Sequence, residues 1–143
     1  MQTDEDGRIV SDKAGSMLEH AQRVAEATGS VALTVDVARA EDAKRMVDAA
    51  YERFGALDIL VNNAGIGHLP QPLEGLPEDE FDRLFAVNMK AIYLAAREAV
   101  PRMKAAGRGV ILNMASTAGV SPRPKLAWYN ASKGWVITAT RAM

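Results

Sequence analysis

The sequence has no cysteine among its 143 residues and only two histidines. Because the chain has no thiol group, it can form no disulfide, and thiolate catalysis and thiolate metal sites are excluded. His20 and His68 stand far apart in the chain and lack the spacing of paired metal ligands. We therefore predict no metal site.

Long apolar runs and a strong charge imbalance are also missing. No run approaches the ~18 apolar residues that suggest a membrane-spanning helix, and the acidic, polar N-terminus does not look like a signal peptide. The formal net charge is −1, which leaves no electrostatic footprint for nucleic acid or an anionic membrane. We expect a soluble, cytoplasmic protein that binds neither of these partners.

The residues that are present suit one folded domain. Hydrophobic residues make up 48% of the sequence and charged residues 24%, which is enough for a core with an ordinary surface. We predict a single domain over residues 1–143, in which the largely polar start, residues 1–12, is poorly ordered.

Alternating apolar patterns predict an α/β protein. Spacings of three and four predict helices, and short apolar or β-branched runs predict strands. Pro101 is expected to kink the third helix or end it early. Because the strands are nearly all apolar, helices should cover both faces of a doubly wound parallel sheet. The predicted helices are 13–28, 41–54, 78–105 and 127–143, and the predicted strands are 31–35, 57–61 and 110–115.

Tyr129 and Lys133 stand four residues apart in the last predicted helix, so both side chains leave one face. A free phenol is a poor acid or base at neutral pH, because its pKa is about 10. An ammonium one helical turn away favours the phenolate, and such a pair can exchange a proton with a carbonyl or alcohol oxygen. A serine hydroxyl such as Ser116 could hold the same oxygen. This spacing also arises by chance, so the interpretation depends on the rest of the chain.

Polar or glycine residues follow each predicted strand. In open α/β sheets, ligands bind beyond the carboxyl ends of the strands, so these residues should gather at one edge. Strands must also end in turn residues, and for Asp36 alone a simple turn role is the favoured interpretation. The three segments are Asp36, Asn62-Asn63-Ala64-Gly65 and Ser116-Thr117.

Two asparagines occupy positions where apolar residues are expected. Asn88 interrupts the apolar stripe of the third helix, where an unpaired buried amide would cost about 1–3 kcal/mol. It needs a partner, and the residue by itself fits a structural role as well as a catalytic one. Asn113 lies inside a strand. There we favour a structural role, because a buried amide usually bonds to neighbouring backbone.

Over about residues 19–143, the order and spacing of these segments resemble the short-chain dehydrogenase/reductases. The resemblance implies a partial Rossmann-like fold and an oxidoreductase that transfers hydride between NAD or NADP and a small carbonyl compound or secondary alcohol. The motifs that carry it are Asn62-Asn63-Ala64-Gly65 after a strand, Val87-Asn88 in the next helix, Ser116 after a strand, Tyr129-x-x-x-Lys133, and Asp36-Val37.

The resemblance implies four catalytic roles. Tyr129 would be the general acid/base on the substrate oxygen, and Lys133 would favour its phenolate and hold the nicotinamide ribose. Ser116 would orient the substrate carbonyl. Asn88 would hold a water in a proton relay. The cofactor performs the hydride transfer, and the protein positions it.

The resemblance also implies a cofactor lining. Asp36 and Val37 would lie where the family contacts the adenine ring. Asn63, Ala64 and Gly65 would line the cofactor next to Tyr129 and Lys133, whereas Asn62 would be more structural. The choice between NAD and NADP is not predicted.

One feature of the family is not found. The family begins with a strand and a glycine-rich turn, T-G-x-x-x-G-x-G, which cradles the pyrophosphate at a helix N-terminus. Gly7, Gly15 and Gly29 do not have this spacing. The chain looks like an internal piece of such an enzyme, and we expect residues 1–143 alone not to catalyse hydride transfer. The alternative is an inactive fragment or pseudoenzyme that at most associates with a full-length relative.

Two predicted helices carry more apolar surface than one sheet face needs, including Tyr93, Trp128 and Trp135. In the family the matching helices form the main subunit interface, so a homo-oligomer through 78–105 and 127–143 is expected when the protein is complete. The alternative is that these aromatic residues cover the protein's own core.

Overall fold

A computed structural model describes residues 2–3, 9–10 and 13–143 of the chain. The contacts divide the chain into two compact units, Met1–Thr34 and Val35–Met143, which we call the N-terminal and C-terminal units. The prediction of a single domain over residues 1–143 stays a prediction.

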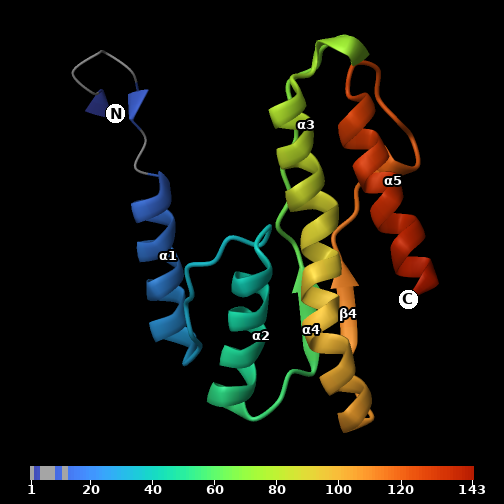
Figure 1. Cartoon of the computed structure of the whole chain (residues 1–143). Helices are drawn as coiled ribbons and strands as arrows, with labels where there is room; N and C mark the ends of the chain where they lie inside the picture. Colours follow the sequence, from blue (N-terminus) through green and yellow to red (C-terminus); the bar gives the residue numbers. More distant parts are fainter. Residues whose placement is uncertain (1, 4–8, 11–12) are drawn as a thin grey trace. The chain divides into compact units, whose positions relative to one another are not determined.

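The described residues of the N-terminal unit form two short strands and a helix (Figure 1). Strands β1 (Gln2–Thr3) and β2 (Ile9–Val10) pair antiparallel. Helix α1 spans Lys13–Thr28 and confirms the helix predicted from the spacing of its apolar residues. The prediction of a poorly ordered start falls mostly on residues 1, 4–8 and 11–12, which lie outside the described residues.

The strand predicted at 31–35 is wrong, since residues 30–36 form no strand. An apolar, β-branched run favours extended backbone, but a strand also needs a neighbour whose N–H and C=O groups complete its ladder. The local pattern cannot supply that neighbour. Asp36 then begins a short turn that leads into helix α2 (Ala40–Phe54).

The C-terminal unit is built on two parallel strands, β3 (Ile59–Asn62) and β4 (Val110–Asn113). Their register pairs Ile59 with Val110 and Asn62 with Asn113. The helices between them form the long crossover that parallel strands require. The strands predicted at 57–61 and 110–115 are confirmed with shifts of one or two residues at their ends.

Helices α2, α4 (Ala91–Ala106) and α5 (Ala127–Ala142) lie side by side in front of the strands (Figure 1). The core between strands and helices includes Val47, Leu60, Ala95, Ala99 and Met103. The other face of the strands is largely bare, because Ile59 and Val61 are 62% and 50% exposed. The α/β fold with a parallel sheet and flanking helices is therefore confirmed, whereas the expected cover on both faces is not seen around these strands.

The helix predicted at 78–105 is continuous but not uniform. It consists of α3 (Glu78–Phe85), a π-helical segment η2 (Ala86–Lys90) and α4. The π segment contains Asn88 and was not foreseen, since nothing in its residue types distinguishes it from α-helix. π-Helical turns inside α-helices occur often at functional sites.

Pro101 does not end the helix, which continues to Ala106. A proline leaves the carbonyl four residues earlier without its usual donor. Both Pro101 and Arg97 are exposed, so water can bond to the Arg97 carbonyl. Of the two effects expected of Pro101, the early end does not occur, because water can replace the missing donor at this carbonyl.

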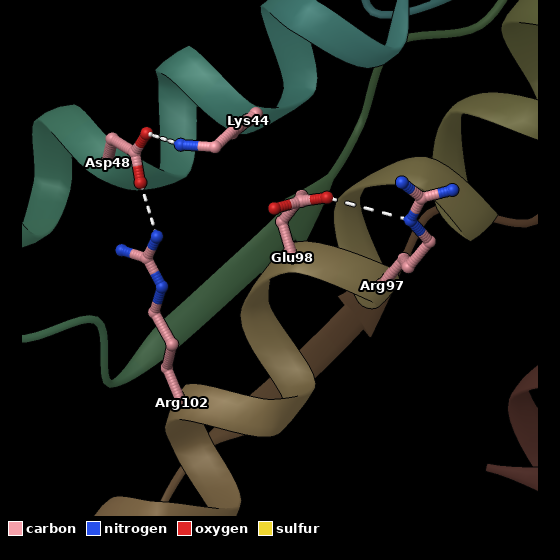
Figure 2. Close-up of polar contacts among 5 residues, drawn as sticks. All are labelled: Lys44, Asp48, Arg97, Glu98 and Arg102. Atoms are coloured by element: carbon pink, nitrogen blue, oxygen red, sulfur yellow. Dashed lines mark hydrogen bonds and ion pairs between the residues drawn. The ribbon is translucent and has the colours of Figure 1, made fainter.

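An ion pair joins α2 to α4 on the outer side of this core (Figure 2). Asp48 on α2 accepts from Lys44 one turn earlier and from Arg102 on α4. Hydrogen bonds from Lys44 and Arg102 hold the pKa of the Asp48 carboxyl below its usual 3.8. On α4 itself, a hydrogen bond with Tyr93 raises the pKa of Arg97, which also pairs with Glu98.

Within the described part of the chain, no helix has the length and apolar character needed to span a membrane.

Candidate active site

A chain of polar side chains crosses the carboxyl ends of the two strands. Asn62 donates to the side-chain oxygen of Asn113 (2.8 Å), and Asn113 donates to Thr140 on α5 (3.0 Å). The structural role expected of both asparagines is supported by these bonds. The partners of Asn113 are side chains rather than the neighbouring backbone that we expected.

Asn88 holds the loop that follows β3. Its Oδ1 accepts from the Ile66 N–H (2.8 Å), and its Nδ2 donates to the Ile66 carbonyl (2.9 Å) and to Ser132 Oγ (3.0 Å). Asn88 and Ser132 are each only 2% exposed. The partner that a buried amide requires is therefore the Ile66 backbone together with helix α5.

Lys133 is buried beneath the same loop, with an exposure of 6%. Its Nζ donates to the Met114 carbonyl just after β4 (2.9 Å). A Cβ added to Gly65 would lie 3.3 Å from Lys133 Nζ and 3.5 Å from Asn88 Oδ1. Gly65, Asn88 and Lys133 therefore lie close together.

Tyr129 stands one helical turn before Lys133 and is half-buried. A Cβ added to Gly67 would lie 3.7 Å from the Tyr129 ring, so the loop after β3 passes over the tyrosine as well. Ser132 donates to the Tyr129 carbonyl (2.7 Å) and so connects Asn88 to this turn of α5.

Ser116 begins the short helix η3 (Thr117–Gly119) at the end of β4. Its Oγ accepts from the Ala118 N–H (3.1 Å). That bond occupies an oxygen lone pair and leaves the hydroxyl proton for donation. Helix η3 packs against α5, so Ser116 is carried on the element next to Tyr129 and Lys133.

A small pocket connects the remaining predicted residues. Val37, Asn63 and Ala64 line it together with Val61, Val87 and residues of α2 and α4. Asn63 and Ala64 are exposed. Asp36 does not line this pocket; its Oδ1 accepts from the Ala38 N–H (3.0 Å), which is the turn role that the sequence favoured for it.

Ser132 and Gly67 were not predicted as site residues. Ser132 stands directly before Lys133, in the middle of a helix, where a serine side chain can bond to nearby backbone. Gly67 lies two residues after Gly65 in the same loop. These positions could have suggested them, but only the fold shows what they contact.

Similarity to known proteins shows the family of this chain. The family model described as short chain dehydrogenase matches residues 4–143. The chain belongs to this family. It is 44% identical over 114 residues to 4-formylbenzenesulfonate dehydrogenase of Comamonas testosteroni, covering 80% of this chain and 45% of that protein. Its relatives include proteins named as dehydrogenases and as reductases.

Solved structures of the family share the fold. The 3-ketoacyl-(acyl-carrier-protein) reductase from Brucella melitensis, complexed with NADH, superposes with a TM-score of 0.81 at 47% identity, covering 92% of this chain and 55% of that one. The gluconate 5-dehydrogenase from Burkholderia cenocepacia J2315, in complex with NADP and tartrate, has a TM-score of 0.78 at 32% identity, covering 93% and 52%. The chain thus spans about half the length of the relatives it matches.

Proposed function

We propose that the protein is an NAD(P)-dependent oxidoreductase that interconverts a small carbonyl compound and a secondary alcohol, with Tyr129 as general acid/base. The observation that carries the proposal is the meeting of Gly65 and Gly67 with Lys133 and Tyr129 under one loop. This loop follows β3, at the edge of the sheet where α/β proteins bind their ligands.

The residues at this edge fit a nicotinamide cofactor. The loop lacks a Cβ at Gly65, where one would come close to the Lys133 ammonium, and so leaves room for a ribose. Lys133 donates one N–H to the Met114 carbonyl, which leaves two N–H groups to donate to ribose hydroxyls and water. Asn63 and Ala64 would line the cofactor, with Asp36 and Val37 towards its adenine. When bound, the cofactor supplies or accepts the hydride.

The side chains of Ser116, Tyr129 and Lys133 orient the substrate and transfer the proton. In the reduction, Ser116 donates a hydrogen bond to the substrate carbonyl oxygen, and Tyr129 transfers its phenolic proton to the same oxygen. The Lys133 ammonium stabilises the phenolate that remains, and solvent returns a proton to it. In the oxidation the Tyr129 phenolate accepts the proton of the alcohol.

Asn88 takes a more restricted part in this scheme. Both N–H groups of its amide are already donated, to Ile66 and Ser132, and one Oδ1 lone pair is used. A relay water at Asn88 must therefore donate to it, either at the second Oδ1 lone pair or at the main-chain carbonyl. The π-helical segment supports the second position, because a wider turn disturbs the usual carbonyl pairing.

Similarity to relatives supports a class of cofactor and a class of substrate for this protein. Solved relatives bind NADH or NADP, so NAD or NADP is proposed here. The 44% identical relative acts on 4-formylbenzenesulfonate, an aldehyde. We propose a small aldehyde, ketone or secondary alcohol as substrate.

Tyr129→Phe tests the proposal in the natural polypeptide that carries residues 1–143. We expect turnover of NADH or NADPH with a panel of aldehydes and ketones to fall at least about a hundredfold, since the proton donor is lost. Cofactor binding, followed by NAD(P)H fluorescence, should change less than about twofold because the ring packing survives. Wild-type turnover in Tyr129→Phe would remove this residue from the mechanism.

The competing proposal is a non-catalytic chain that associates with a full-length relative. It is favoured by the bare strand face, on which Ile59, Val110 and Leu112 are 62%, 59% and 51% exposed. NAD(P)H fluorescence separates the two: enhancement on binding supports the enzyme, and its absence supports the non-catalytic chain.

A further inference from the structure

We infer that Gly119 is a positioning residue, which sets where Ser116 lies relative to Tyr129 and Lys133. The inference rests on the proposed function for its kinetic consequences and on contact geometry for the position itself.

The contact at Gly119 is backbone against backbone. A Cβ added there would lie 2.7 Å from the Lys133 carbonyl carbon, 2.8 Å from the Gly134 nitrogen and 2.8 Å from Ile137 Cδ1. All three distances are shorter than 3.0 Å, and real Cβ atoms essentially never come that close to another heavy atom. Gly119 is not among the residues with positive φ, so this glycine is required by close approach rather than by backbone conformation.

The turn that holds Gly119 also holds Ser116. The Gly119 N–H donates to the Ser116 carbonyl (3.0 Å), and the Ala118 N–H donates to Ser116 Oγ. Ala118 is 4% exposed, so the middle of the turn is buried and held by packing. A displacement of Gly119 must therefore carry Ser116 with it.

The other side of the contact is the catalytic helix itself. Gly119 touches the main chain of Lys133, one turn after Tyr129. Where η3 meets α5, the closest approach at Gly119 is thus to main-chain atoms of Lys133 and Gly134, with Ile137 Cδ1 beside them. Closely packed backbone segments are stiff, so this contact can set the distance between η3 and α5. We call the contact between Gly119 and the backbone of Lys133 and Gly134 the joint.

Two other glycines serve as controls. A Cβ at Gly134, on the α5 side of the same joint, would lie 3.6 Å from the Gly119 carbonyl oxygen, an ordinary contact. A Cβ at Gly109, at the start of β4, would lie 2.5 Å from Met103 in the core, and its φ is 154°. Gly134→Ala tests the joint without a clash, and Gly109→Ala tests a clash away from the joint.

Gly119→Ala must separate η3 from α5 by some tenths of an ångström. Misplacement of a catalytic group by about 1 Å can cost a hundredfold in rate. In the natural polypeptide we expect kcat to fall about 10- to 100-fold, with the cofactor KM within about twofold. Gly134→Ala should keep kcat within about twofold, and Gly109→Ala should lower the Tm while kcat at 25 °C changes little.

A double variant separates positioning from general damage. If Gly119 acts through Ser116, Ser116→Ala should cost little further kcat in the Gly119→Ala background, because the serine is already misplaced. The inference would be overturned if the losses of kcat in Gly119→Ala and Ser116→Ala multiplied in the double variant. A wild-type kcat in Gly119→Ala would also overturn it, as would equal losses of kcat in Gly119→Ala and Gly134→Ala. Should Gly119→Ala not fold, adding Ile137→Ala removes the side-chain part of the clash and leaves the backbone part.

A readout without turnover keeps the two proposals apart. Gly119→Ala should shift the amide NMR resonances of residues 116–118 and 133, whereas Gly134→Ala should shift only those of its immediate neighbours. Unshifted resonances at 116–118 in Gly119→Ala would overturn the joint. If the wild type binds no NAD(P)H and shows no turnover, the proposed function fails, and the joint is then judged by these shifts alone.

Discussion

At the scale of single residues, Asn88 decides how the loop after β3 is held. Its amide makes three hydrogen bonds, two of them to both backbone groups of Ile66 and one to Ser132 on α5. The loop that carries Asn63, Ala64 and Gly65 is thus tied to the helix that carries Tyr129 and Lys133. A side chain that satisfies buried backbone in this way is hard to replace.

We predict that Asn88→Ala lowers the free energy of unfolding by about 2–4 kcal/mol, because it leaves the Ile66 N–H and carbonyl without partners and opens a small cavity. Urea denaturation followed by circular dichroism measures this loss. Asn113→Ala is the matched control. Its partners are the side chains of Asn62 and Thr140, which can turn to water, so it should lose less than half as much. An Asn88→Ala variant within about 0.5 kcal/mol of the wild type would contradict the prediction.

At the scale of elements, α2 and α4 are held together by two kinds of contact. Val47 packs against Ala95, Ala99 and Met103 in the core. Outside it, Arg102 on α4 pairs with Asp48 on α2 (Figure 2). The Arg102 guanidinium also lies 4.9 Å from the centre of the Tyr51 ring on α2. The charged contact adds to the packing only while Asp48 is ionised.

We predict that Asp48→Asn lowers the Tm by a few degrees at pH 7 and has little effect near pH 2. The pKa of Asp48 is lowered in the folded protein, so its stabilisation is present above the unfolded value of 3.8 and disappears as the pH falls below it. Calorimetric scans from pH 2 to 7 follow the difference between wild type and variant.

Glu98→Gln provides the control for this series. Glu98 pairs at 3.6 Å with Arg97, its neighbour on α4 (Figure 2), and forms no ion pair with a second element in the described part of the chain. We expect a much smaller change in Tm at every pH. A difference for Asp48→Asn that grew towards pH 2 would have the wrong sign and would refute the assignment.

At the scale of the whole molecule, an apolar groove runs between α3 and α5. Phe81 meets Trp128 edge-on at 5.4 Å, so part of this aromatic surface packs against itself. Much remains open, since Phe81, Phe85 and Tyr93 are 38%, 44% and 53% exposed. The residues that line the groove are Phe81, Leu84, Phe85, Met89, Trp128, Ala131, Ser132 and Trp135.

We predict that the natural polypeptide self-associates through this groove and its neighbouring helix surfaces. Phe85→Glu should convert the oligomer to monomer in light scattering at micromolar concentration, because a carboxylate cannot be buried there without a partner. Phe54→Glu replaces a somewhat more exposed phenylalanine, at 59%, on α2 and should leave the oligomer intact. A monomeric wild type, or dissociation by both variants, would count against the interface.

The sequence by itself determined the helices, the two paired strands and the family. Apolar spacing places α1, α2 and α5 almost to the residue, because a helix satisfies its own backbone and needs only a stripe to pack. It also indicated that Tyr129 and Lys133 share a face, since i and i+4 do so in any α-helix.

Tertiary structure decided what depends on partners distant in the sequence. Residues 31–35 form no strand because a ladder requires a neighbour, which a local pattern cannot provide. Asn88 proved to bond to Ile66, a residue 22 positions earlier, and the π segment around it was invisible to periodicity. Gly119 looked like any loop glycine until its Cα was seen against the backbone of Lys133. Close approach between elements is a property of packing, and no residue type announces it.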